Sequence, residues 1–280
     1  MVELTVLGSV LRAIGVLYWL LAFGVLALVL WKVRGRVGKG LSALAVVVLF
    51  GWLPAKQAYE AQKRHNYARE AWAYFNKLCD EKSGEKIYKT YTGVKSVLVV
   101  KPLPPAKDMD HFDQFWYGDP YSASATSVRA RAAASILTLS SRRPTGIQEG
   151  LEFVEMRLEA DGAPRYQRIT RPTSNSEVAR TEFIDKPVSR FGISWEDIST
   201  PEDRVYWVAG SRLQVIDLTD NSVVAERIGY FIEAGFGSRA GGRRPWLTSR
   251  GPNTTCPPLK GGDYTDQWFI TSVLKQNGDK

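Results

Sequence analysis

"SRLQVIDLTDNSVVAERIGYFIE" spans residues 211–233 and decides the fold class of this chain. Leu213, Val215 and Asp217 alternate with residues that face the opposite way, which is the period of a β-strand. The letters TDNS have the composition of a turn, and residues 223–231 return with β-branched and aromatic side chains. The stretch therefore predicts two antiparallel strands joined by a short turn.

Segments on both sides of this hairpin extend the predicted sheet. Residues 204–210, "RVYWVAG", read as part of the same sheet, and residues 151–158 and 165–170 read as strands separated by the turn signal "ADGAP". Residues 87–101 are rich in β-branched and aromatic types, with Gly93 as a bulge or turn.

The last patterned segment is "DQWFITSVLKQ", which fits either a helix capped by Thr265 or a final strand. Together with the strand-like segments it predicts an α+β domain with a mainly antiparallel sheet.

A long helix is expected immediately before this sheet, over residues 56–79. Ser83 and Gly84 supply its stop signal. One face of the helix is expected to dock on the domain's own sheet, with a dimer seam as the alternative. The residues of this face recur at spacings of three and four: Ala58, Ala61, His65, Ala68, Trp72, Phe75 and Cys79.

Two apolar runs precede that helix. Residues 13–31 contain no charge and would span about 28 Å as a helix, close to the hydrocarbon thickness of a bilayer. Residues 41–55 would span about 22 Å, and Trp31 and Trp52 lie near the ends of the runs, where indole rings favour the interface. The runs predict two transmembrane helices; the alternative is a buried helical hairpin in a soluble core.

The connection between these runs is "KVRGRVGKGLS", residues 32–42. It resembles a phosphate-binding loop, but Val33 stands where the first glycine belongs and Gly40 where the hydroxyl belongs. Basic residues in short loops stay cytoplasmic, so both chain ends are expected on the periplasmic side. The loop's cations are Lys32, Arg34, Arg36 and Lys39; the competing basic residues after the second run are Lys56, Lys63, Arg64 and Arg69.

This pattern divides the chain into a transmembrane hairpin, residues 1–55 with a basic loop at 32–40, and a soluble domain, residues 56–280. The formal net charge is +8, and the hairpin carries about half of it. The excess of basic residues therefore reflects topology, and no nucleic-acid partner is expected. The expected partners are the lipid bilayer and a protein of the envelope.

Cys79 and Cys256 are the only cysteines. If the domain is exported they can form one disulfide, which would stabilise the fold by about 4 to 5 kcal/mol in the chain-entropy model. Two separate buried thiols are the alternative. The sequence has no ligand spacing for zinc and no motif for another cofactor, so no metal and no cofactor are expected.

The first candidate binding segment is "DMDHFDQFWYGDPY", residues 108–121. Its aromatic residues and Asp119 suit a partner-contact loop, because aromatic side chains are enriched at interfaces. The same composition describes a loop that buries its rings, and the acids beside His111 leave an acid–base or metal site open. Phe112 and Asp113 break the calcium-loop pattern. The predicted contact residues are Phe115, Trp116, Tyr117 and Asp119.

The second candidate lies in residues 237–262, read as a long loop with Arg243, Arg244 and Trp246 as predicted binding residues. Solvated charges, or contacts with lipid headgroups, are the alternatives. A third stretch, "SWEDISTPED" at 194–203, reads as an exposed acidic turn with a helix cap.

No stretch assigns a catalytic activity. We expect a non-enzymatic protein anchored in a bacterial inner membrane, whose periplasmic domain binds another macromolecule, for example as an immunity-type or accessory protein. One alternative is an oligomeric subunit of a secretion or conjugation assembly, joined through helices that contain Gly15, Gly24 and Ala27. Another is an envelope enzyme that uses residues 108–121.

Overall fold

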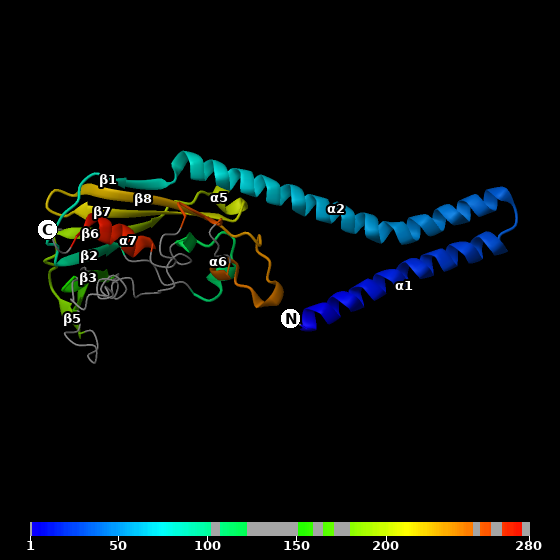
Figure 1. Ribbon diagram of the computed structural model, residues 1–280, viewed down its shortest axis with the longest axis horizontal. Helices are drawn as coiled ribbons and strands as arrows, with labels where there is room; N and C mark the ends of the chain where they lie inside the picture. The colour runs from blue at the N-terminus through cyan, green and yellow to red at the C-terminus, as the bar shows by residue number, and fades with distance from the viewer. Residues whose placement is uncertain are drawn as a thin grey trace. The chain divides into compact units, whose positions relative to one another are not determined.

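The computed structural model describes residues 2–101, 107–121, 151–158, 165–170, 180–248, 253–258 and 265–275 (Figure 1). The chain forms two compact units, Met1–Ala68 and Arg69–Lys280. The predicted division at residue 55 marks the end of the second apolar run; the second unit begins further along the same helix, at Arg69.

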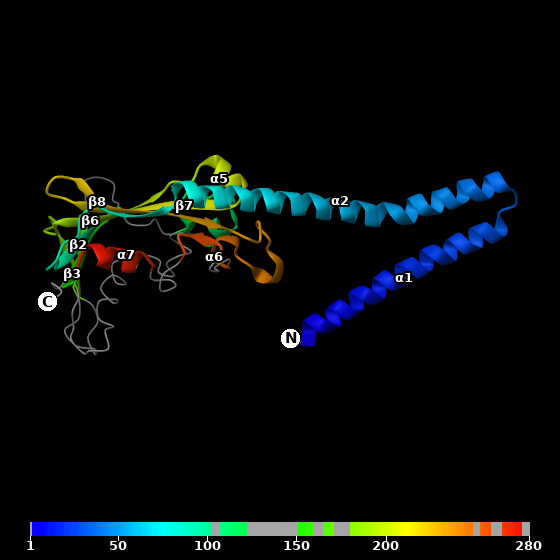
Figure 2. The ribbon, with the colours of Figure 1, turned by 45° about the horizontal axis from the view of Figure 1, so that its top comes forward.

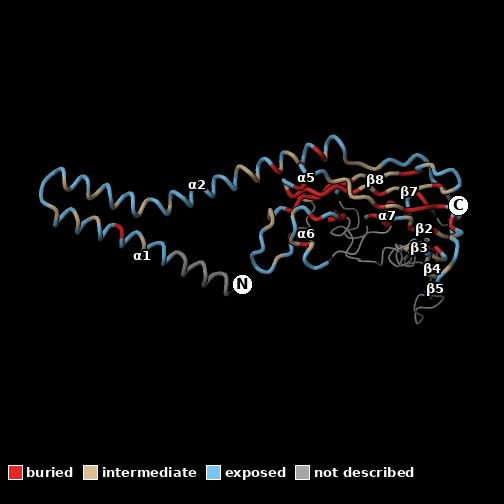
Figure 3. The backbone as a smooth tube through the Cα atoms, turned by 180° about the vertical axis from the view of Figure 1, so that it is seen from behind, coloured by how far each residue is buried: buried red, intermediate tan, exposed pale blue. Residues whose placement is uncertain are grey.

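The first unit is a helical hairpin of α1 (Val2–Lys32) and the first part of α2 (Arg36–Lys82). Both helices are long and apolar enough to cross a membrane, and almost none of their apolar windows is buried (Figure 3). The turn between them is shorter than the predicted loop, because only residues 33–35 are non-helical. Gly35 takes a φ of +97°, which favours glycine.

The helices of the hairpin meet along a narrow seam. On α1 the less exposed side chains recur at helical spacing at Tyr18, Ala22, Leu26 and Val29. Tyr18 reaches across the seam, and its ring centroid lies 5.7 Å from that of Phe50 on α2. The other faces of both helices are exposed and apolar.

Tyr18 also fills a gap in the backbone hydrogen bonds of α2. Pro54 lies inside the helix and has no N–H, so the carbonyl of Phe50 lacks its usual donor four residues ahead. The hydroxyl of Tyr18 donates a hydrogen bond to that carbonyl. An unsatisfied carbonyl is costly in an apolar surrounding, so Tyr18 fixes α1 against the proline position.

We expect Tyr18→Phe to destabilise the hairpin by about 0.6 to 2 kcal/mol, the usual range for hydrogen bonds between membrane helices. Pro54→Ala restores the amide donor, so Tyr18→Phe should cost almost nothing in that background. The measurement is the unfolding midpoint of all four proteins in a titration with sodium dodecyl sulfate. If Tyr18→Phe destabilised the hairpin equally in both backgrounds, the role given to the Tyr18–Phe50 hydrogen bond would be contradicted.

The second unit is built on a mixed sheet. In the described residues it has nine strands in the order β1-β8-β7-β6-β2-β3-β4-β5, with β9 also paired to β8. β2 pairs in parallel with β3 and β6, and the other pairings are antiparallel. The predicted mixed fold with a mainly antiparallel sheet is therefore confirmed. The strands are β1 (Gly84–Ile87), β2 (Ser96–Lys101), β3 (Phe153–Leu158), β4 (Arg165–Thr170), β5 (Arg180–Ile184), β6 (Phe191–Asp197), β7 (Val208–Asp217), β8 (Ser222–Ile232) and β9 (Thr255–Cys256).

The hairpin predicted over 211–233 is confirmed as β7 and β8. Leu213, Val215 and Asp217 are buried on one face, as their alternation indicates. The strands pair from Val208↔Ile232 to Asp217↔Ser222, with a register shift after Val215.

Two helices pack on opposite faces of this sheet (Figure 2). α7 (Thr265–Val273) buries Phe269, Ile270 and Val273 in a cluster with Leu213 and Val215. The end of α2 buries a separate set, whose members come from α2, β7, β8 and β9: Ala71, Phe75, Leu78, Val208, Tyr230, Ile232 and Cys256.

The predicted docking face of α2 is correct only in its second half. Phe75 is buried and Trp72 packs against the same cluster, but Ala58, Ala61 and His65 are exposed and belong to the first unit. Helical spacing predicts a continuous face but does not show where the sheet that covers it begins.

Cys79 and Cys256 form a disulfide that ties the end of α2 to β9, across 177 residues of sequence. The structure thus contains the disulfide that the sequence analysis predicts for an exported domain.

Several predicted boundaries differ from the structure. Residues 87–101 contain the end of β1 and then β2, separated by a turn in which Gly93 has a φ of +71°. Residues 204–210 begin in α5 (Pro201–Val205), and the strand starts at Val208, because Thr200 and Pro201 favour a helix start. The turn "ADGAP" lies outside the described residues.

The described residues of the segment 237–262 are not a single long loop. They contain the 3-10 turn η2 (Ala240–Gly242), α6 (Pro245–Thr248) and β9. The ambiguous segment near the C-terminus is a helix, α7, which begins at Thr265 itself.

A buried ionic group joins α7 to the sheet. Arg227 on β8 is 1% exposed, donates to Asp266 at 2.9 Å, and donates to the hydroxyl of Tyr121. Its Nε lies 3.4 Å from Glu85, and the indole of Trp195 donates to the other oxygen of Asp266. Burial raises the pKa of Tyr121 to about 12, so this hydroxyl stays protonated.

A second buried carboxylate, Glu155 on β3, holds the segment that precedes β6. It accepts hydrogen bonds from the amides of Val188 and Ser189, from the Ser189 hydroxyl and from Arg168. Burial alone would raise the pKa of Glu155, but these donors outweigh it and hold the pKa below its usual value.

Candidate functional site

The structure brings the two candidate binding segments together. Residues 107–121, which include η1 (Asp110–Phe112), lie against residues 235–248, and we call them the paired loops. The indole of Trp246 donates to the carbonyl of Asp113 at 2.7 Å. Two further contacts join the two segments. Arg244 forms an ion pair with Asp108 at 3.3 Å, and the guanidinium of Arg239 lies 5.0 Å from the ring centroid of Phe112. Segments about 130 residues apart thus form one structural feature.

Short-range hydrogen bonds shape residues 107–121. Asp110 accepts from the amide of Lys107 at 2.7 Å, and Asp113 accepts from the amide of Phe115 at 2.9 Å. Gln114 donates to the carbonyls of Arg204 and Val205, which attaches the segment to the end of α5. These acidic residues therefore fold the loop.

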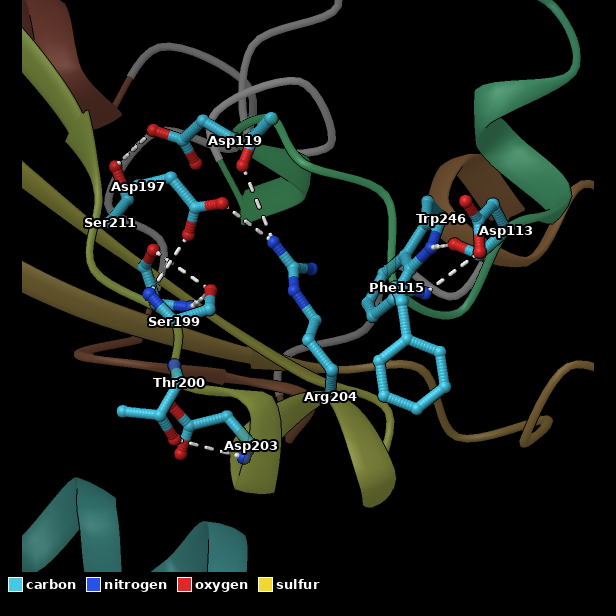
Figure 4. A network of polar contacts seen from close by, with 12 residues as sticks. Asp113, Phe115, Asp119, Asp197, Ser199, Thr200, Asp203, Arg204, Ser211 and Trp246 are labelled. Carbon is cyan, nitrogen blue, oxygen red and sulfur yellow. Dashed lines mark hydrogen bonds and ion pairs between the residues drawn. The ribbon is translucent and has the colours of Figure 1, made fainter.

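Arg204 on α5 is the buried centre of the site (Figure 4). Its Nη2 donates to Asp197 at 2.8 Å and to the carbonyl of Gly118 at 3.3 Å. Its guanidinium lies 5.1 Å from the ring centroid of Trp246, within reach of a cation–π interaction. Burial lowers the pKa of Arg204, although Asp197 opposes this shift. Arg204 thus connects α5 to both of the paired loops.

The acidic stretch at 194–203 has a structural role here. Thr200 caps α5 by accepting from the amide of Asp203, and Asp203 accepts from the amide of Thr200, which completes a capping box. Asp203 also accepts from Tyr74 on α2 at 2.7 Å. The predicted cap is confirmed, but Asp203 is buried, so the prediction of an exposed turn is wrong for it.

The predicted contact residues on 108–121 divide by exposure. Tyr117 is 99% exposed and Phe115 is 55% exposed. Trp116, between them in the sequence, and Asp119 are buried, and Asp119 accepts from the hydroxyl of Ser211 on β7 at 2.7 Å. Composition could not separate the two groups, because buried and exposed aromatic residues alternate along one segment.

The predicted residues on 235–248 differ in burial: Trp246 is buried, Arg243 is half-buried and Arg244 is exposed. Trp246 is fully buried, and Arg243 donates to Glu233, a buried carboxylate that also accepts from the amides of Gly235 and Gly237. Arg244 remains partly exposed beside Asp108. An aromatic residue beside arginines resembles a binding patch in sequence, but here it forms the core of the loop.

The acid–base or metal alternative gains no support from this geometry. Within the described part of the chain, His, Cys, Asp and Glu side chains form no group of three or more that could hold a metal. His111 is buried, with its ring edge-on to Trp116 at 5.8 Å. Asp110 and Asp113 are occupied by backbone amides.

Sequence reasoning missed two parts of the site. Val205 at the end of α5 is 45% exposed and its carbonyl accepts from Gln114, and Arg204 organises the loops from within. Residues 204–210 read as a strand in sequence, so neither residue was assigned to a helix end. The Thr-Pro-Glu-Asp run is the signal that could have identified α5.

Comparisons of the chain with protein families, with curated proteins and with solved structures found no match.

Proposed function

We propose that this chain is a non-enzymatic protein anchored in a bacterial inner membrane by the α1–α2 hairpin. Its second unit lies in the periplasm and binds another protein through the exposed side of the paired loops. The observation that carries the binding proposal is the exposure of Tyr117 and Phe115 on a segment fixed from within. The role that we propose for this chain is that of an immunity-type or accessory protein.

Three features support the anchoring and its orientation. α1 and α2 are long and apolar enough to cross a membrane. Their tight connection carries Lys32, Arg34, Arg36 and Lys39, the pattern of a cytoplasmic loop. The Cys79–Cys256 disulfide suits an oxidising compartment such as the periplasm.

Rigidity supports the binding role of the exposed aromatic residues. Trp116, between Phe115 and Tyr117, is buried, and the backbone around it is held by Asp113, Gln114 and Arg204. Aromatic residues held in place lose little conformational freedom when a partner binds, and tyrosine is favoured at interface centres. Phe115 and Tyr117 therefore suit the role of anchors.

The test is site-specific photo-crosslinking in intact cells. A photoreactive phenylalanine analogue replaces Tyr117 in one strain and Phe183 in another; Phe183 is an aromatic residue 73% exposed on β5, so it serves as the matched control. We expect a discrete crosslinked protein from position 117 and none of the same mass from position 183. Identical patterns from both positions would contradict the proposal.

Once the crosslinked partner is identified, Phe115→Ala with Tyr117→Ala should weaken its binding by about 30-fold or more, as for interface anchors worth about 2 kcal/mol. The free energy of unfolding should stay within about 0.5 kcal/mol of the parent value, because both side chains are exposed. The measurements are the dissociation constant by interferometry and the urea midpoint. Phe183→Ala should change neither.

A second candidate function is that of a subunit in an envelope assembly. Gly15, Gly24 and Ala27 lie on exposed parts of α1, and nothing lies within 4 Å of a Cβ placed on either glycine. Such positions permit close helix–helix contact between copies. A ladder of crosslinked species in membranes would favour this function, and a strict monomer in mild detergent would count against it.

A further inference from the structure

At the end of its apolar run and beyond it, α2 carries a stripe that alternates aromatic and basic side chains. Trp52, Lys56, Tyr59 and Lys63 follow one another at spacings of four, three and four residues, so they lie on one face of the helix. All four are exposed, Trp52 at 71% and Tyr59 at 68%.

This stripe lies on the side of α2 that turns away from α1. The seam residues Phe50 and Pro54 each precede a stripe residue by two positions, and residues two apart point about 200° apart around an α-helix. Within the apolar run, the same face carries Val48 and Leu49, which are 59% and 72% exposed. The stripe thus continues the face that a bilayer would cover.

The positions along the helix also match the edge of a bilayer. Trp52 falls near the end of the apolar run, Lys56 is the first charge after it, and Lys63 lies about 12 Å beyond the run's end. Indole and phenol rings prefer the headgroup level, and lysine side chains reach several ångströms along the helix towards it. The positive charge then faces the phosphates of anionic lipids.

We propose that Trp52, Lys56, Tyr59 and Lys63 form a binding stripe for anionic phospholipid headgroups where α2 leaves the membrane. The proposal rests on the anchoring part of the proposed function but not on the protein partner or on the orientation. It assigns a role to the basic residues after the second run, which compete with the loop as a topology signal.

The experiment uses the full chain with a photoreactive phenylalanine analogue at Tyr59, reconstituted into vesicles of phosphatidylglycerol and phosphatidylcholine in equal amounts. Mass spectrometry of the crosslinked protein gives the ratio of the two lipids captured at this position. Because each lysine near the surface contributes about a fivefold preference at low salt, we expect phosphatidylglycerol to predominate by at least that factor. The preference should decline as the salt concentration rises.

Lys56→Gln with Lys63→Gln should bring the capture ratio close to one. The matched control is Lys77→Gln with Lys82→Gln, which removes the same charge from exposed positions on the same helix, outside the stripe. It should leave the ratio unchanged. Equal capture of both lipids by the parent protein, or a ratio insensitive to Lys56 and Lys63, would overturn the proposal.

Flotation of the same vesicles separates this proposal from the anchoring that it requires. Protein that floats with the vesicles but captures both lipids equally overturns the stripe and leaves the anchoring intact. Protein that does not float overturns both.

Discussion

Asp266→Ala should lower the free energy of unfolding by about 3 to 5 kcal/mol, the usual cost of removing one partner from a buried ion pair. Arg227 is 1% exposed, and Asp266 is the partner that its Nη1 contacts at 2.9 Å. Without Asp266, the guanidinium keeps Tyr121 and the more distant Glu85, neither of which replaces a fully buried carboxylate. The measurement is urea unfolding of the full chain in nonionic detergent.

The matched control is Glu152→Ala, which removes the carboxylate of the exposed pair Lys95–Glu152. An exposed pair contributes about 0 to 1 kcal/mol, so its loss should barely move the midpoint. Replacing Arg227 and Asp266 together by methionine and leucine should restore much of the lost stability, because no charge then stays buried. Equal effects of Asp266→Ala and Glu152→Ala would contradict this role.

Removing the disulfide should have a comparable effect. In the chain-entropy model, a bridge across 177 residues contributes about 5 kcal/mol by restricting the unfolded chain. Serine at both Cys79 and Cys256 should therefore lower the urea midpoint strongly while leaving the native α2–β9 contact largely in place.

Dithiothreitol provides the control for this prediction. It should lower the midpoint of the wild-type protein to that of the double-serine variant and leave the variant's own midpoint unchanged. A wild-type midpoint that is insensitive to reductant would contradict the contribution assigned to the bridge.

The parts of the fold that were predictable from sequence depend on local patterns. The hairpin of β7 and β8 follows from alternation and a turn within 23 residues, and α2 follows from helical spacing closed by Ser83 and Gly84. The cysteine pairing was accessible because the chain has only two cysteines.

The buried ionic contacts were not predictable, because their partners lie far apart in the sequence. Arg227 meets Tyr121 and Asp266, which are 106 and 39 residues away. An arginine within an alternating strand normally indicates a solvent-facing position. Arg227 is buried where Asp266 of α7 and Tyr121 pack against β8.

The sequence indicated which segments form the candidate site, but not which of their side chains are exposed. Composition pointed to residues 108–121 and to the arginines near 243, but it did not reveal that these segments pack on each other. Trp246 and Trp116 are buried and Tyr117 is exposed, although all three are aromatic residues in loop-like sequence. Which of these residues are buried depends on the position of Arg204 and Asp197, which belong to other segments of the chain.

The most direct test of the central claim, an anchored protein whose second unit lies in an oxidising compartment, is the thiol state of Cys79 and Cys256 in intact membranes. The membranes are alkylated under denaturing conditions, with and without reductant, and the cysteine peptides are identified by mass spectrometry. We expect a Cys79–Cys256 bridge in nearly all molecules, with alkylation only after reduction. Two free thiols without reductant would contradict this expectation and favour the inverted topology, with the second unit in the cytoplasm.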